Sequence, residues 1–289
     1  MKAADNTLLS IKKYFSDKLT ADFEQSEIET FFIWCVEDFL GLSKIEINLN
    51  KTQRLSESEI LKFHFAINKI KEHEPIQYIL GNTWFYNLQF DVNPDVLIPR
   101  PETEELVDWI LKSETEGKLL DIGTGSGCIA ISLAHHNKKL NVFACDVSEG
   151  ALHVARKNAL KNNAKVQFDW IDILEDDLTE KYDIIVSNPP YIPLFDKELM
   201  APNVLDFEPE LALFVENEIP LIFYETIAEK GLTGLNHNGK IYFEIHEEYA
   251  TDVSDVLKEL GYSDIEIKQD LQGKNRMIRA TLIKKLVAV

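Results

Sequence analysis

The most chemically informative residues form a tetrapeptide, Asn188-Pro189-Pro190-Tyr191, directly after a predicted strand at 182–187. A planar, conjugated NH2 group is a poor nucleophile, because its lone pair is delocalised. Two acceptors that take its two hydrogens, the Asn188 side-chain oxygen and the Pro189 carbonyl, can aim that lone pair at an electrophilic carbon. The prolines stiffen the loop, and the Tyr191 ring can stack on a flat group. The tetrapeptide therefore predicts a site that positions an amino or amide nitrogen. The alternative is a plain rigid turn.

A glycine-rich run, Asp121-Ile-Gly-Thr-Gly-Ser-Gly127, lies between a predicted strand at 118–122 and a predicted helix at about 127–136. Glycines in this position let the backbone turn tightly and approach a ligand closely. The next predicted strand, at 141–147, contains Asp146 near its end, about 20 residues further on, where a carboxylate can bind ribose hydroxyls. These features predict a cofactor of nucleoside type. A turn without a ligand is the simpler alternative.

The run departs from the dinucleotide fingerprint, because its third glycine would fall at 128, where the chain has Cys128. Asp121 would also repel a pyrophosphate, whereas it would attract a cationic sulfonium. The loop therefore favours S-adenosylmethionine over a nicotinamide dinucleotide.

A third carboxylate, Asp172, follows the predicted strand at 165–171 and is followed by Ile173. It could accept from an adenine amino group with Ile173 beside the ring; Asp169 is the rival for this role. The candidate cofactor-binding residues are Asp121, Gly123, Thr124, Gly125, Ser126, Gly127, Asp146, Asp172, Ile173 and Asn188. The histidines match no metal-ligand pattern, and we expect no metal.

The amino-acid composition indicates which classes of partner and which cellular compartment to expect. The 289 residues are 45% hydrophobic and 27% charged, as in folded proteins, and length alone suggests two domains. With 30 basic and 49 acidic residues, the formal net charge is −19, which argues against a nucleic-acid partner. Three cysteines without a CxxC pair, and a start that resembles no signal peptide, predict a cytoplasmic protein. We expect no membrane segment and a monomer.

The sequence divides into three parts. Residues 1–74 predict a small helical bundle, with capping boxes at Ser26/Glu29 and Ser56/Glu59. Residues 75–94 contain strand-forming residues, Tyr78 and Ile79 among the first, and predict a β-hairpin that joins two domains.

Residues 95–289 alternate between predicted strands and helices, which is typical of an α/β fold with a mostly parallel sheet. Further helices are expected at 102–113, 149–162, 216–231 and 248–260, and further strands at 240–245, 264–269 and 276–284. The last two strands form a closing hairpin, so at least one of the seven strands is antiparallel.

The glycine run and the tetrapeptide together resemble class I methyltransferases, which have a Rossmann-like fold and modify amide or amino nitrogens. Three further segments resemble the release factor glutamine methyltransferases, the PrmC or HemK family. These are Pro75-Ile-Gln-Tyr-Ile-Leu-Gly81, Leu97-Ile-Pro-Arg-Pro-Glu-Thr-Glu104 and Phe207-Glu-Pro-Glu-Leu-Ala-Leu213. The order of helical domain, hairpin and methyltransferase domain is also similar.

The resemblance implies methyl transfer from S-adenosylmethionine to the glutamine of the Gly-Gly-Gln motif in class 1 peptide chain release factors. It implies that Asn188, Pro189, Pro190 and Tyr191 hold this glutamine as catalytic and substrate-binding residues, and that 1–74 recognises the partner. Arg100 and Glu208 are additional candidates at the substrate mouth. Open alternatives are an adenine amino methyltransferase of nucleic acid, a glutamine methyltransferase of a ribosomal protein, and a binding module without activity.

Overall fold

The computed structural model describes residues 5–283, which form two compact units. One unit contains the chain through Gly81 together with residues 202–207; the other contains residues 82–201 and the chain from Glu208 onward. This division differs from the boundaries at 74 and 95 drawn from the sequence. A short helix after Pro75 packs with the helical unit, and the β-hairpin packs with the sheet.

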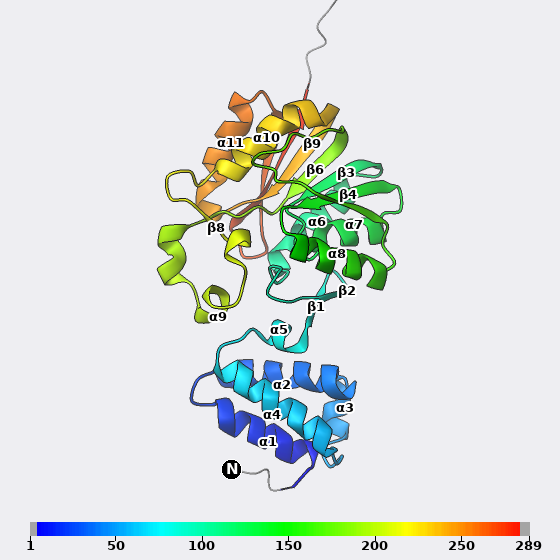
Figure 1. Cartoon of the computed structure of the whole chain (residues 1–289), viewed down its shortest axis with the longest axis vertical. Coiled ribbons are helices and arrows are strands. Elements are labelled where there is room, and N and C mark those ends of the chain that lie inside the picture. Colours follow the sequence, from blue (N-terminus) through cyan, green and yellow to red (C-terminus); the bar gives the residue numbers. More distant parts are fainter. Residues whose placement is uncertain (1–4, 284–289) are drawn as a thin grey trace, which may run out of the picture. The chain divides into compact units, whose positions relative to one another are not determined.

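The first unit is a helical bundle, as its hydrophobic periodicity predicts (Figure 1). Its helices are α1 (Leu8–Leu19), α2 (Gln25–Leu40), α3 (Lys44–Leu49), α4 (Glu57–Lys71) and α5 (Ile76–Leu80). Apolar side chains at helical spacing meet in one core, which includes Ile11, Phe15, Phe63 and Ile67. Ile60, which follows the same helical spacing, is only partly buried at the edge of this core.

Helix caps were predicted correctly at one of two places. The Ser56 hydroxyl accepts from the Glu59 amide and the Glu59 carboxylate accepts from the Ser56 amide, which is the expected capping box of α4. The box predicted at Ser26 is wrong, because α2 starts two residues earlier, with Glu24 as its N-cap and Glu27 completing the box. A glutamate can fill a position where hydroxyl side chains are statistically preferred.

The hairpin consists of β1 (Asn82–Phe85) and β2 (Leu88–Asp91). Its turn residues, Tyr86 and Asn87, both have positive φ, 47° and 62°, as a two-residue hairpin turn requires. Tyr78 and Ile79 were expected in a strand and instead belong to α5. Gly81, in the left-handed region, caps that helix and does not form the hairpin turn.

The second unit contains a seven-stranded sheet in the order β10-β11-β9-β6-β3-β4-β5. Its strands are β3 (Gly117–Ile122), β4 (Leu140–Asp146), β5 (Val166–Trp170), β6 (Tyr182–Ser187), β9 (Leu235–Glu244), β10 (Ser263–Gln269) and β11 (Asn275–Leu282). β11 pairs antiparallel with both neighbours, and the remaining pairs are parallel. The mostly parallel fold is confirmed; residue 284 of the last predicted strand lies outside the described residues.

Helices cover both faces of this sheet (Figure 1). One face packs against α6 (Pro101–Ser113), α7 (Cys128–His136), α8 (Glu149–Lys161) and the hairpin. The other packs against α10 (Ile222–Gly234) and α11 (Ala250–Glu259). The segment predicted as helix from 216 is irregular before α10, and β9 begins five residues before the predicted strand at 240.

Several shorter elements follow one another along the chain between β6 and α10. They are β7 (Ile192–Pro193), η1 (Leu194–Leu199), α9 (Pro202–Leu205), η2 (Glu210–Ala212) and β8 (Phe214–Val215), with η3 (Glu247–Tyr249) before α11. Among residues 5–283, no helix combines the length and apolar character needed to cross a membrane.

The α4 cap can be tested against the position where prediction failed. We expect Ser56→Ala to destabilise α4 by about 1 kcal/mol, because it leaves the Glu59 amide without its acceptor. Ser26→Ala, inside α2, is the control and should cost nothing, since alanine favours helix interiors. Hydrogen exchange of α4 and α2 amides measures both; equal loss of protection in the two variants would contradict the assignment of the caps.

Candidate active site

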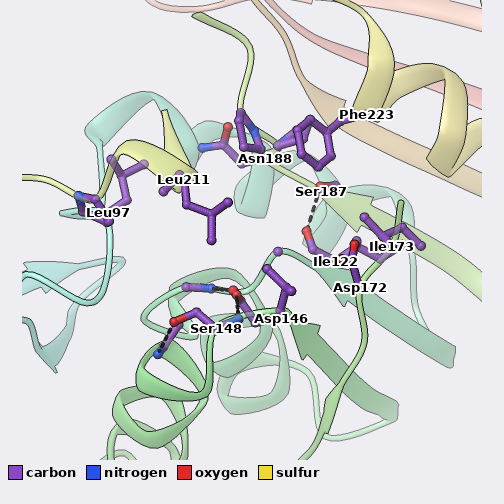
Figure 2. A pocket seen from close by; sticks show the side chains of 18 of the residues that line it. Leu97, Ile122, Asp146, Ser148, Asp172, Ile173, Ser187, Asn188, Leu211 and Phe223 are labelled. Atoms are coloured by element: carbon purple, nitrogen blue, oxygen red, sulfur yellow. Dashed lines mark hydrogen bonds between the residues drawn. The ribbon is translucent and has the colours of Figure 1, made fainter. Parts of the chain in front are cut away.

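A cleft lies at the carboxyl edge of the sheet, above the ends of β3, β4 and β6. Its volume of about 260 Å³ is near the lower end of the roughly 300–1,000 Å³ found for small-molecule sites. In Figure 2, Asp146 and Ser148 lie below the cleft, and Asn188 and Phe223 lie above it. Leu97 and Leu211 lie on one side, and the opposite side is formed by Ile122, Asp172 and Ile173. This is the edge where ligands bind in open α/β sheets.

The glycine run turns from β3 into α7 along this cleft. Gly123 and Gly125 have φ of +71° and +55°, and a Cβ on either would enter open space. A Cβ on Gly127 would instead lie 2.6 Å from the Ile131 side chain and 3.2 Å from Ala155. The first two glycines therefore leave room for a ligand, whereas Gly127 permits close packing of the loop on α7 and α8.

Asp121 lies beneath the loop and does not line the cleft. Its side chain is fully buried, and Oδ2 accepts from Thr124 Oγ1 at 2.6 Å and from the Ala130 amide at 3.3 Å. Oδ1 has no hydrogen-bond partner among the described residues. Burial raises the pKa of Asp121 to about 7, against the effect of these two bonds. Asp121 thus shapes the loop from below; direct binding of a ligand to it remains a prediction.

Asp146 connects the loop to the next helix. Its Oδ2 accepts from the Gly125 amide at 2.8 Å and its Oδ1 from the Ser148 amide at 2.9 Å, while the Ser148 hydroxyl caps α8. Burial raises the pKa of Asp146, and these backbone bonds oppose the shift. Both oxygens hold the backbone at the cleft, and each has a second lone pair for ligand hydroxyls.

The structure distinguishes Asp172, after β5, from the alternative Asp169, within β5. Asp172 and Ile173 both line the cleft, and their contact with an adenine remains a prediction. Asp172 Oδ1 accepts from the Leu174 amide at 3.0 Å, which keeps the carboxylate at the turn. Asp169 is exposed within β5 and does not line the cleft.

The tetrapeptide enters the cleft through Asn188, Pro189 and Pro190. Asn188 Nδ2 donates to Thr103 Oγ1 at 3.3 Å. Tyr191 does not line the cleft; its hydroxyl donates to Glu244 Oε1 at 3.4 Å. The structure therefore brings three members to the cleft and ties the fourth to the core. Stacking of Tyr191 on a substrate remains a prediction.

The partly exposed Arg100 forms an ion pair with the buried Glu208. Arg100 Nη2 donates to Glu208 Oε1 at 2.6 Å, and the Ile98 amide donates to Glu208 Oε2 at 3.2 Å. Glu208 is only 4% exposed. The pair fastens the loop before α6 to the loop before η2, and neither residue lines the cleft.

Those two loops supply cleft residues that the sequence reasoning did not single out. Leu97 and Leu211 form an apolar wall, and Phe223 and Ile227 add one turn of α10. Leu97 and Leu211 fall in two of the segments that carry the family resemblance, which was the available signal. Phe223 and Ile227 have only helical spacing in common, so nothing distinguished them from ordinary core residues.

The donor set fits S-adenosylmethionine. The open side of Gly123 and Gly125 admits a ligand against the backbone, Asp146 can accept from hydroxyls, and Ile173 offers an apolar contact. Asn188 and Pro189 line the same cleft, so a planar nitrogen held by them would lie beside the bound cofactor. Within residues 5–283, no group of three or more His, Cys, Asp or Glu side chains is placed to hold a metal ion.

Two family models match the chain: the PrmC N-terminal domain over residues 13–81 and the methyltransferase small domain over residues 102–201. Among solved structures, a methyltransferase from Pyrococcus furiosus is similar with a TM-score of 0.52 and 18% identity, covering 78% of this chain and 98% of that one. This likeness shows the fold alone.

Curated relatives match nearly the whole chain. A release factor glutamine methyltransferase from Flavobacterium psychrophilum is 43% identical, with 93% of this chain and 98% of that protein covered. Proteins of the same name from Bacteroides thetaiotaomicron and Lactococcus lactis are 43% and 41% identical, with 93% and 90% of this chain and 98% and 96% of those proteins covered.

Alanine substitutions at Gly125 and Gly127 should distinguish a glycine needed for cofactor binding from one needed for the stability of the second unit. We expect Gly125→Ala to weaken S-adenosylmethionine binding about tenfold or more, because its Cβ occupies the cleft. Both alanines are strained at positive φ, but only Gly127→Ala also overlaps with Ile131, so it should destabilise the second unit by about 2–4 kcal/mol and by more than Gly125→Ala does. Calorimetric binding and urea unfolding measure the two effects; the reverse pattern would refute this division of roles.

The buried carboxyl predicts a pH-dependent stability. Because the folded-state pKa of Asp121 is about 7 instead of 3.8, its favourable contribution is complete below pH 4 and is lost as pH rises through 7. Asp121→Asn removes this titration. The free energy of unfolding of the variant, relative to that of wild type, should therefore increase by up to roughly 4 kcal/mol from pH 4 to pH 7. Asp169→Asn, at an exposed site, is the control. Urea unfolding across this range checks it; parallel curves would show that Asp121 does not titrate there.

Proposed function

The chain belongs to the release factor glutamine methyltransferase family, and we propose that its Asn188–Tyr191 loop holds the acceptor glutamine amide in the cleft described above. Its cofactor is S-adenosylmethionine, which supplies an electrophilic methyl group on a sulfonium when bound. The substrate is the glutamine of the Gly-Gly-Gln motif in class 1 peptide chain release factors. The supporting observation is that Asn188, Pro189 and Pro190 line the same cleft as Gly123 and Gly125.

The chain contributes to the reaction by positioning. Asn188 Oδ1 and the Pro189 carbonyl accept the two amide hydrogens, which turns the nitrogen lone pair toward the cofactor side of the cleft. No strong base is needed at this step, because the amide proton becomes acidic only as the new bond forms. Alignment of this kind can supply up to about 7–11 kcal/mol of barrier lowering. Leu97 and Leu211 give the cleft an apolar wall against which the side chain of the acceptor glutamine can pack.

The partner is a protein and not a nucleic acid in this proposal. The net charge of −19 supports this choice, since nucleic-acid affinity depends on cations that neutralise phosphates. The match of residues 13–81 to the PrmC N-terminal domain supports a role of the helical unit in partner recognition. We further propose that the enzyme acts as a monomer in the cytoplasm; the unpaired cysteines Cys35, Cys128 and Cys145 are consistent with a reducing compartment.

The acceptor is identified by transfer of a labelled methyl group from S-adenosylmethionine. The acceptors are a bacterial release factor, its Gly-Gly-Gln→Gly-Gly-Ala variant and duplex DNA, tested side by side. We expect label on the unmodified factor alone. Label on DNA, or equal label on both factors, would overturn the proposed acceptor residue.

Asn188→Ala tests the role of the loop. We expect label transfer to fall below detection, because one of the two acceptors for the amide hydrogens is lost, while the cofactor Kd stays within about threefold. Asn141→Ala, at an exposed position at the amino end of β4, is the matched control and should retain full activity. Loss of cofactor binding together with activity would refute an acceptor role for Asn188.

A further inference from the structure

A buried threonine connects the active-site loop to a buried glutamate. Thr103 lies in the first turn of α6, within the Leu97–Glu104 segment, and is 2% exposed. Its Oγ1 donates to Glu244 Oε2 at 2.6 Å and accepts from Asn188 Nδ2 at 3.3 Å. Glu244, at the end of β9, is also 2% exposed. The chain Asn188–Thr103–Glu244 thus runs from the cleft into the core.

The direction of these hydrogen bonds is determined by how many protons each group has. A threonine hydroxyl has one hydrogen, and the short bond to Glu244 uses it. Toward Asn188, the hydroxyl oxygen can therefore only accept. It must face the NH2 group of the Asn188 amide, which leaves Oδ1 of that amide for an occupant of the cleft.

Glu244 can impose this direction because an ionised carboxylate only accepts. Burial and, to a smaller extent, the charge of Glu102 raise the pKa of Glu244. The hydrogen bonds from Thr103 and Tyr191 and the charge of Arg276 act in the opposite direction and favour the ionised form. The Tyr191 hydroxyl donates to the second oxygen, Oε1, at 3.4 Å. Glu244 thereby holds both ends of the Asn188–Tyr191 loop.

We infer that Glu244 is a positioning residue which, through Thr103, sets the orientation of the Asn188 amide so that its oxygen, and not its nitrogen, meets the substrate NH2 group. This inference rests on the proposed function of Asn188 as an acceptor. The inverted amide would present a donor to a donor, and the two NH2 groups would repel each other.

The inference predicts different hydrogen bonding of Asn188 in two nearly isosteric substitutions. In Glu244→Gln, the new NH2 group can donate to Thr103 while the Gln oxygen still accepts from Tyr191. Thr103 must then donate to Asn188, which inverts the amide. In Thr103→Val, Asn188 loses its partner and both orientations become available. Thr103→Ser keeps the hydroxyl and therefore the direction.

Methyl transfer to a release factor measures these effects. We expect kcat to fall about tenfold in Thr103→Val and about ten- to hundredfold in Glu244→Gln, with Thr103→Ser within about threefold of wild type. The KM for S-adenosylmethionine should stay within about threefold in all three. Adding Glu244→Gln to Thr103→Val should lower kcat little further, because Glu244 acts through Thr103.

Controls separate positioning from loss of fold. Thr281→Val changes another buried threonine, on β11 opposite Lys240, four residues along β9 from Glu244, and should keep wild-type kcat. Thermal unfolding identifies any variant that does not fold. A folded Glu244→Gln variant with wild-type kcat would overturn the inference. So would a Thr103→Ser variant that loses as much activity as Thr103→Val.

A readout without substrate distinguishes failure of this inference from failure of the proposed function. The side-chain NH2 resonances of Asn188, assigned by their loss in Asn188→Ala, should shift in Thr103→Val and Glu244→Gln but not in Thr281→Val. Unchanged resonances in the first two would overturn the network itself. Wild-type transfer to the release factor independently tests the proposed function.

Discussion

Parallel pairing of β3 with β4 on one side and β6 on the other is the constraint on which the active site depends. All three strands run in the same direction, so the loops that follow them emerge at one edge of the sheet. The glycine run after β3, Asp146 at the end of β4 and Asn188 after β6 therefore converge on one cleft. The residues proposed to hold the cofactor and those proposed to hold the acceptor are brought together by strand order and not by proximity along the chain.

Buried polar side chains that do not line the cleft hold the loops that form it. Asp121 and Asn158 hold the glycine run, and Asn158 also links this run to the hairpin. Glu208 joins the loop before α6 to the loop before η2. Glu244 holds the ends of the tetrapeptide loop. Each group would be costly to bury alone, and hydrogen bonds to loop backbone or side chains offset that cost. Loops fastened in this way are rigid without regular secondary structure, which suits an enzyme that works by alignment.

The tetrapeptide itself would accept any planar NH2 group, since a glutamine amide and an adenine amino group present the same two hydrogens. Selection of the acceptor must therefore come from residues around it. Leu97 and Leu211, which line the cleft, belong to two of the segments that distinguish this family. The ion pair of Arg100 with Glu208 keeps these two loops together. In the proposed function, the tetrapeptide at the end of β6 positions the acceptor nitrogen, and the loops that contain Leu97 and Leu211 select the acceptor.

The sequence by itself determined the helical bundle, the strand–helix alternation and the two loops with chemistry, because each leaves a local signal. Hydrophobic spacing marks Phe63 and Ile67 as core, and glycines such as Gly125 mark a turn near a ligand. It misplaced Tyr78 and Ile79, since a short apolar run fits helix or strand equally, and residues 202–207 joined the first unit without any local indication.

Only the tertiary structure decided that Asp121 lies under its loop and that Asp172 lines the cleft while Asp169 does not. It alone placed Thr103 between Asn188 and Glu244. Local signals report what a residue type can do. Which partner it meets depends on strand order and on helices packed from distant parts of the chain, and no spacing within a segment records that.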